Sequence, residues 1–124
     1  MLIDPVYIPS GSFEAFGPIV DLHALAKRCS RGRKTCRVQA PAFNGDELPP
    51  GARVVYRGQM SHTEDFASTS SPTGGFLMQE GAADGTAAAS ACFKFSLRQH
   101  RYFRFAITGQ GVKAANKRAV CSIE

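Results

Sequence analysis

The 124-residue sequence contains no tryptophan, only three histidines and no long apolar run. A membrane-spanning helix needs about 20 consecutive apolar residues, and no window of the chain approaches that. The histidines, His23, His62 and His100, are too widely spaced to form an HExxH zinc motif. The first residues, MLIDPVYIPS, lack the basic and apolar regions of a secretory signal peptide. We therefore expect a protein that is synthesised in a cytoplasm and has no membrane partner.

Residues that could carry catalysis do not gather in a recognisable motif. His62, Glu64 and Asp65 lie together in a Ser/Thr-rich stretch, where turn formation explains the carboxylates better than metal binding or acid–base chemistry does. The nearby serines lack the context of a nucleophile elbow. The glycines of 109–111 are not followed by the GKS or GKT of a phosphate loop. The sequence therefore predicts a protein that is not an enzyme and has no metal and no cofactor.

The four cysteines do not have the spacing of a metal site. Six residues separate Cys29 from Cys36, which is wider than the two to four residues of a zinc knuckle. Cys92 and Cys121 lie inside apolar runs and are predicted to be small core residues. A cytoplasm keeps all four thiols reduced. The sequence leaves open whether Cys29 and Cys36 form a disulfide after oxidation.

The strongest structural signal is the alternation of apolar and polar residues toward the C-terminal end. We predict that five residues in this alternation line a core: Phe93, Phe95, Phe103, Phe105 and Ile107. Further strands are predicted over 52–60 and 118–124, a turn over 108–111, and one short helix over 20–28 that is capped by Asp21. Short strands between Gly- and Pro-rich turns predict a single all-β domain over residues 1–124, either a sandwich or a barrel.

The stretch SLRQHRYFRFAITGQG (96–111) has two interpretations. Interleaved arginines and aromatics are typical of a surface on which nucleic-acid bases stack. Such a surface places its rings on the same exposed face as its arginines. Here Phe103 and Phe105 alternate with Arg104, and only Tyr102 shares its face. The pattern therefore favours an ordinary sandwich strand.

Positive charge is concentrated in one segment, KRCSRGRKTCR, at 27–37. Its six basic residues are Lys27, Arg28, Arg31, Arg33, Lys34 and Arg37. The other 113 residues hold nine basic and ten acidic side chains, so the segment accounts for the whole net charge of +5. Six like charges repel one another and favour a mobile binding arm. Guanidinium groups pair equally well with carboxylates and phosphates, so an acidic protein surface and a nucleic acid are both natural partners.

The second half of the chain resembles the cement or decoration proteins of tailed-bacteriophage capsids. The matching pieces are RVVYRGQMSHTEDF (53–66), HRYFRFAITGQG (100–111) and RAVCSIE (118–124), and GPIVDL (17–22) is similar to an early strand of that family. The resemblance implies a jelly-roll-like antiparallel β-sandwich with at most one short helix and long loops. It also implies a homotrimer that clamps the major capsid protein on the outside of the virion, without catalysis.

Taken together, these observations predict a structural virion protein that cements a phage capsid. In this interpretation the basic residues of 27–37 grip an acidic surface of the capsid protein. The small residues of 81–91 would allow another copy of the chain to approach closely. The alternatives are a nucleic-acid-binding module that uses 27–37, and a sandwich that binds a carbohydrate or another ligand. The absence of tryptophan weakens the carbohydrate alternative.

Overall fold

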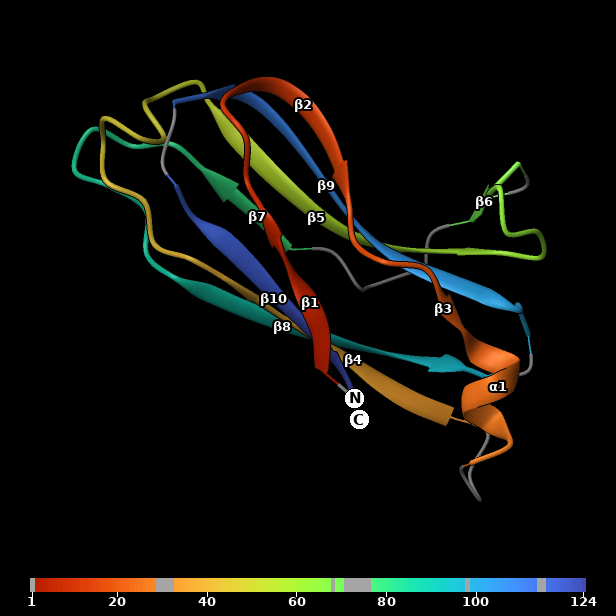
Figure 1. Cartoon of the computed structure of the whole chain (residues 1–124). Helices are drawn as coiled ribbons and strands as arrows, with labels where there is room; N and C mark the ends of the chain where they lie inside the picture. The colour runs from red at the N-terminus through yellow and green to blue at the C-terminus, as the bar shows by residue number, and fades with distance from the viewer. Residues whose placement is uncertain (1, 29–32, 68, 71–76, 98, 114–115) are drawn as a thin grey trace.

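A computed structural model of the chain describes residues 2–28, 33–67, 69–70, 77–97, 99–113 and 116–124. Within these ranges the chain forms ten strands and one short helix (Figure 1). The elements are β1 (Leu2–Tyr7), β2 (Gly11–Phe16), β3 (Val20–Asp21), α1 (Leu22–Ala26), β4 (Arg33–Ala40), β5 (Arg53–Ser61), β6 (Thr69–Ser70), β7 (Leu77–Glu80), β8 (Ala89–Ser96), β9 (Tyr102–Val112) and β10 (Arg118–Ile123).

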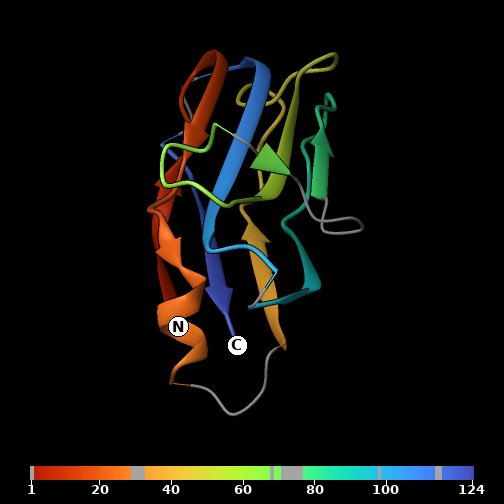
Figure 2. The same cartoon turned by 90° about the vertical axis from the view of Figure 1, so that its right-hand side faces the viewer.

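The strands form two antiparallel sheets that lie face to face (Figures 1 and 2). The first sheet has the order β1-β10-β4-β8. The second is built on β2-β9-β5, with β3 paired to β9 and with β6 and β7 paired to β5. Apart from the two-residue strands β3 and β6, the orders are β1-β10-β4-β8 and β2-β9-β5-β7, which is the eight-strand arrangement of a jelly roll. The predicted all-β sandwich is thus confirmed.

The core lies between the sheets, where the period-2 alternation places one face of each strand. Phe103, Phe105 and Ile107 of β9 are fully buried, and Phe95 of β8 is nearly so. Tyr56 of β5 stacks on Phe105 with ring centroids 6.2 Å apart. Because burying one such side chain contributes roughly 1.5–3 kcal/mol, this face provides much of the stabilisation. The core prediction is confirmed for these residues, whereas the Phe93 side chain is outside the described part.

The predicted short helix is also present. Leu22–Ala26 form α1, and the Asp21 carboxylate accepts hydrogen bonds from the backbone N–H groups of His23 and Ala24 at 3.0 and 3.2 Å. This is the N-cap arrangement, in which a side chain satisfies the first free donors of a helix. The hydrogen bond from Ala24, with the Arg101 guanidinium beside the carboxylate, holds the pKa of Asp21 below its usual value. None of the described helices is long and apolar enough to cross a membrane.

The predicted turn at 108–111 is wrong, because β9 continues through it to Val112. The glycines serve the strand instead. A Cβ atom at Gly109 would overlap the ring of Phe13 on the neighbouring β2, and Phe13 is the direct partner of Gly109 in the β2–β9 ladder. Gly111 has a φ of 69°, which an L-residue with a side chain rarely adopts. Pairing along both edges of β9 therefore outweighs the local turn preference of this stretch.

Part of the small-residue segment 81–91 packs closely against the loop after β4. A Cβ atom at Gly81 would overlap the carbonyl oxygen of Pro49, and one at Gly45 would overlap the carbonyl oxygen of Ala83. A bridge between Phe43 and Thr86 joins the same two loops. At Gly81 and Gly45 the close neighbour is thus intramolecular, whereas Ala83, Ala87 and Ala88 are exposed, and the expectation that this segment allows another copy of the chain to approach stays a prediction.

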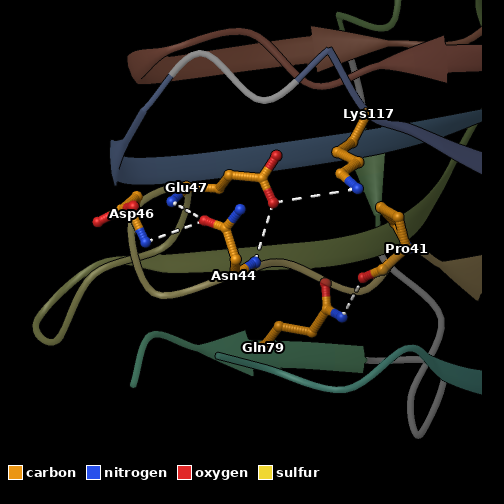
Figure 3. Close-up of polar contacts among 6 residues, drawn as sticks. All are labelled: Pro41, Asn44, Asp46, Glu47, Gln79 and Lys117. Atoms are coloured by element: carbon orange, nitrogen blue, oxygen red, sulfur yellow. Dashed lines mark hydrogen bonds and ion pairs between the residues drawn. The ribbon is translucent and has the colours of Figure 1, made fainter. Parts of the chain in front are cut away.

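A buried amide ties these loops to the core. Gln79 of β7 is 3 % exposed, and its Oε1 accepts a 2.6 Å hydrogen bond from the Tyr56 hydroxyl. Its Nε2 donates to the carbonyl oxygens of Pro41, at 2.7 Å (Figure 3), and of Ala87, at 3.1 Å. All three bonds have good geometry for their type. Gln79 therefore connects β5 with two loops, the one that follows β4 and the one that precedes β8.

The loop after β4 is organised by its own side chains (Figure 3). The Asn44 side-chain oxygen accepts from the N–H groups of Asp46 and Glu47, and Glu47 Oε1 accepts from the N–H of Asn44. This reciprocal pattern is that of a capping box. Lys117 Nζ lies 4.0 Å from Glu47 Oε1, and the N–H of Lys113 donates to the Glu47 carbonyl. The loop is thereby joined to the connection between β9 and β10.

Candidate partner-binding surfaces

The basic segment 27–37 does not form one continuous arm. Lys27 is the C-cap of α1, and the N–H of Arg28 donates to the carbonyl of Leu25. Residues 29–32, including Arg31, lie outside the described part. From Arg33 onward the chain is strand β4. The predicted mobile arm is therefore wrong for 33–37, because ladder pairing with β8 and β10 fixes that part of the segment.

Two basic side chains in the strand part of the segment, Lys34 and Arg37, lie in different environments. Lys34 is half-buried and pairs with Phe95 in the ladder. Arg37 points to the outer face of the first sheet, where its Nε lies 3.8 Å from Glu124 Oε2 with both side chains about half exposed. An exposed pair of this kind contributes at most about 1 kcal/mol. Lys94 of β8 lies on the same face, opposite Thr35. The structure thus brings Arg37 and Lys94 onto one face and leaves Lys27 and Arg28 at the helix end.

A second basic surface lies on the outer face of the other sheet, and the sequence reasoning did not single it out. Arg53 and Arg57 of β5 point outward because Val54 and Tyr56 point into the core. They line a groove of about 760 Å³ whose other lining residues include Val55, Met78, Thr108 and Gln110. We call this feature the β5 groove. No acidic side chain is among the described residues that line it.

The β5 groove has the composition of a protein-binding surface. Arginine, methionine and aromatic residues are enriched at interfaces, and lysine is depleted. Met78 is 51 % exposed, and Phe16 on the same outer face is 39 % exposed. In the ladders, Arg53 faces Glu80 of β7 and Arg57 faces Ala106 of β9. The groove thus combines apolar contact area with two guanidinium groups, which suits a partner that carries carboxylates.

Arg104 forms a fixed cationic centre on this same face. Its guanidinium carbon lies 3.8 Å from the ring centroid of Phe16 and 4.2 Å from that of Phe66. Its Nε donates a 2.8 Å hydrogen bond to Gln59 Oε1. Phe66 is buried and has a φ of 56°, so the loop after β5 folds back onto the sheet. The contact fixes this loop, since a cation between two rings is attracted by both faces.

This arrangement also supports the interpretation of the stretch 96–111 as an ordinary sandwich strand. Phe103 and Phe105 face the core, whereas Arg104 faces outward. The rings beside Arg104 come from distant parts of the chain, and the guanidinium lies over both of them. Their faces toward Arg104 are therefore not open for base stacking, which needs exposed rings.

Asp65 and His62, in the loop after β5, make local contacts. The Asp65 carboxylate accepts a 3.0 Å hydrogen bond from the N–H of Ala67, and its pKa is lowered mainly by a hydrogen bond from Thr63. The rings of His62 and His100 stack with centroids 4.6 Å apart. Burial, together with the neighbouring His62, lowers the pKa of His100. Among the described residues, no group of three or more His, Cys, Asp or Glu could hold a metal ion.

The positions of the cysteines match the sequence expectation only in part. Cys92 is exposed on the outer face of β8, so its predicted core position is wrong; Phe95 of the same strand, three residues on, occupies the core face instead. Cys121 is buried as predicted. Cys36 is also buried, and its Sγ lies 3.3 Å from that of Cys121. Cys29 lies outside the described residues.

Neither a scan against protein-family models nor a search of curated proteins finds a match for the chain.

Proposed function

We propose that the protein is a structural component of a tailed-bacteriophage particle and that it binds and stabilises the capsid as a cement protein. The observation that carries this proposal is the jelly-roll order of the two sheets. It is the architecture implied by the resemblance of 53–66, 100–111 and 118–124 to capsid cement proteins. A rigid sandwich also suits a protein whose role is to hold neighbouring subunits.

The partner in this proposal is an acidic surface of the major capsid protein. Two separate groups of basic side chains support this proposal: Lys27 and Arg28 at the end of α1, and Arg53 and Arg57 in the β5 groove. Individual surface ion pairs are weak and are screened by salt. Several contacts that engage together, and several linked copies of the chain, convert weak contacts into durable attachment. We propose a trimer as the working form, on the basis of the resemblance alone.

The first experiment measures whether the protein belongs to the particle. Purified particles of the phage that encodes this chain are separated by sedimentation, and the copies of this chain per particle are quantified. We expect many copies per particle. Recovery of the protein only in the soluble fraction of infected cells, with none on particles, would contradict the proposal.

The second experiment locates the contact surface with charge-neutralised variants added to particles that lack the protein. The helix-end variant is Lys27→Gln with Arg28→Gln, and the groove variant is Arg53→Gln with Arg57→Gln. The matched control, Lys113→Gln with Arg118→Gln, removes the same charge from other exposed positions. We expect at least one of the first two variants to bind about tenfold or more weakly, because truncating one partner of a charge pair that becomes buried on binding costs about 2 kcal/mol or more.

The same variants separate the proposal from nucleic-acid binding. A DNA or RNA ligand gives an affinity that falls steeply and linearly on a log–log salt plot, with a slope set by the number of phosphates contacted. We expect the wild-type protein to show only weak binding of this kind. Tight, salt-steep binding to DNA that the helix-end variant abolishes, with particle binding unchanged in both variants, would favour the nucleic-acid alternative.

A further inference from the structure

Two cysteines that are far apart in the sequence meet in the core of the first sheet. Cys36 lies on β4 and Cys121 on the neighbouring β10, and their sulfur atoms are 3.3 Å apart. Their exposed fractions are 0 % and 1 %. In the ladder Cys36 is opposite Ile123 and Cys121 is opposite Val38. The two thiols are therefore diagonal neighbours on the inner face of the sheet.

This distance is short enough for a covalent bond to form with little movement. A disulfide has an S–S length of about 2.05 Å, so the sulfur atoms need to approach by about 1.3 Å. Cys92 points to the opposite face of the sheet and is exposed, so it does not compete for this bond inside the core.

The closed core protects the pair. The hydrogen bond with Cys121 and burial raise the pKa of the Cys36 thiol, so the reactive thiolate is scarce in the closed state. The pair lies close to the end of β10, however, since this strand ends at Ile123. Glu124 is held by two backbone hydrogen bonds to Thr35, at 2.8 and 2.9 Å. Local opening of this strand end would admit a small oxidant, as strand ends open more readily than the whole fold.

We propose that Cys36 and Cys121 are a modification site at which an intramolecular disulfide forms when the protein meets a peroxide. In the first step one thiolate attacks a peroxide oxygen, the S–O bond forms as the O–O bond breaks, and the leaving hydroxide takes up the proton that the thiol had lost, which gives a sulfenic acid and one water. In the second step the other thiol attacks that sulfur, the S–S bond forms and a second water leaves. Two thiols and one hydrogen peroxide thus give one disulfide and two waters, with the peroxide as the two-electron oxidant.

The bond would join the central strand β10 to β4 and close a loop that spans most of the chain, since 85 positions separate the two cysteines. A cross-link over a long loop restricts the unfolded chain and raises the thermal midpoint, by roughly 5–15 °C after an allowance for strain. A reducing cytoplasm would keep the dithiol form, and release into an oxidising medium would produce the cross-linked form. This inference does not depend on the proposed capsid function.

The test uses a Cys29→Ser, Cys92→Ser background, in which only the buried pair can react. The reduced protein is treated with hydrogen peroxide, denatured and alkylated, and its mass is then measured by mass spectrometry. We expect a loss of two hydrogen atoms in mass, two thiols that resist alkylation until a reductant is added, and a higher thermal midpoint than in the reduced sample. Adding Cys36→Ser to this background should abolish all three effects.

The wild-type chain, which keeps all four cysteines, tests whether a different disulfide forms. After the same treatment its disulfides are mapped by digestion without reduction. A Cys36–Cys121 peptide pair supports the proposal. A Cys29–Cys36 pair would overturn it, as would two freely alkylated core thiols at a peroxide concentration that has fully oxidised Cys92.

Discussion

Replacing Tyr56 with phenylalanine tests the buried amide network at its simplest point. The change removes one hydroxyl, and with it the 2.6 Å hydrogen bond to Gln79 Oε1, while the ring keeps its stack on Phe105. Gln79 is 3 % exposed, so water cannot readily replace the lost donor. Leaving a buried acceptor unsatisfied costs about 1–3 kcal/mol. We expect the free energy of unfolding to fall by that amount.

The size of the effect can be checked against a larger change at the same site. Gln79→Leu removes the acceptor for the buried Tyr56 hydroxyl and both donors to the part-buried carbonyl oxygens of Pro41 and Ala87, so three groups lose a partner at once. We expect a cost of about 2–5 kcal/mol. The double variant should cost less than the sum of the two single variants, because each single change removes the same hydrogen bond between residues 56 and 79. Coupled neighbours typically deviate from additivity by about 0.5–3 kcal/mol.

Urea unfolding measures all three variants. For a domain of this size a loss of about 2 kcal/mol moves the midpoint by roughly 1 M, with the slope unchanged. The matched control is Tyr102→Phe, which removes a hydroxyl from a partly exposed tyrosine on the outer face of β9 and should change stability by less than about 0.5 kcal/mol. The reasoning fails if Tyr56→Phe is as mild as this control, or if the two single variants are strictly additive.

Three further predictions concern other parts of the fold. Phe105→Ala should cost about 3–5 kcal/mol in urea unfolding, because it empties a fully buried site; a change below 1 kcal/mol would refute its core role. Gly81→Ala should lower the thermal midpoint, because its Cβ would overlap the Pro49 carbonyl oxygen; an unchanged midpoint would contradict that contact. Burial and His62 lower the pKa of folded His100, so the unfolded state binds the proton more readily. Stability should therefore fall as pH drops below about 6.5, and His100→Gln should flatten that part of the profile.

The sequence predicts the parts of this fold that depend on local periodicity. The alternation in β9 and β5 identifies their core faces because side chains on a strand alternate between two sides. The cap at Asp21 identifies α1 because the capping bonds join residues that are close in sequence. By contrast, β1 and β2 were not predicted, because Pro5 and the alternation of Phe13 with polar residues give weak local signals.

The candidate surfaces could be predicted only in part. The basic residues of 27–37 are visible in the sequence, but their division between a helix end and strand β4 depends on pairing with β8 and β10. The β5 groove and the ring contacts of Arg104 join residues from elements far apart in the chain. The outward phase of Arg53 and Arg57 was the one available signal. The Cys36–Cys121 contact likewise needs the register of two strands 85 positions apart.

The position of β10 in the first sheet has a consequence for how the protein is made. β10 lies between β1 and β4, and Leu2 pairs with Ser122, so nearly the whole described chain separates these partners. A ribosome that has synthesised β1 through β9 has therefore not yet supplied the strand that joins β1 to its sheet. Until β10 arrives, β1 and one edge of β4 present unpaired backbone groups that favour aggregation. Closure of this sheet therefore waits for the synthesis of β10, and pairing over such sequence separations is intrinsically slow.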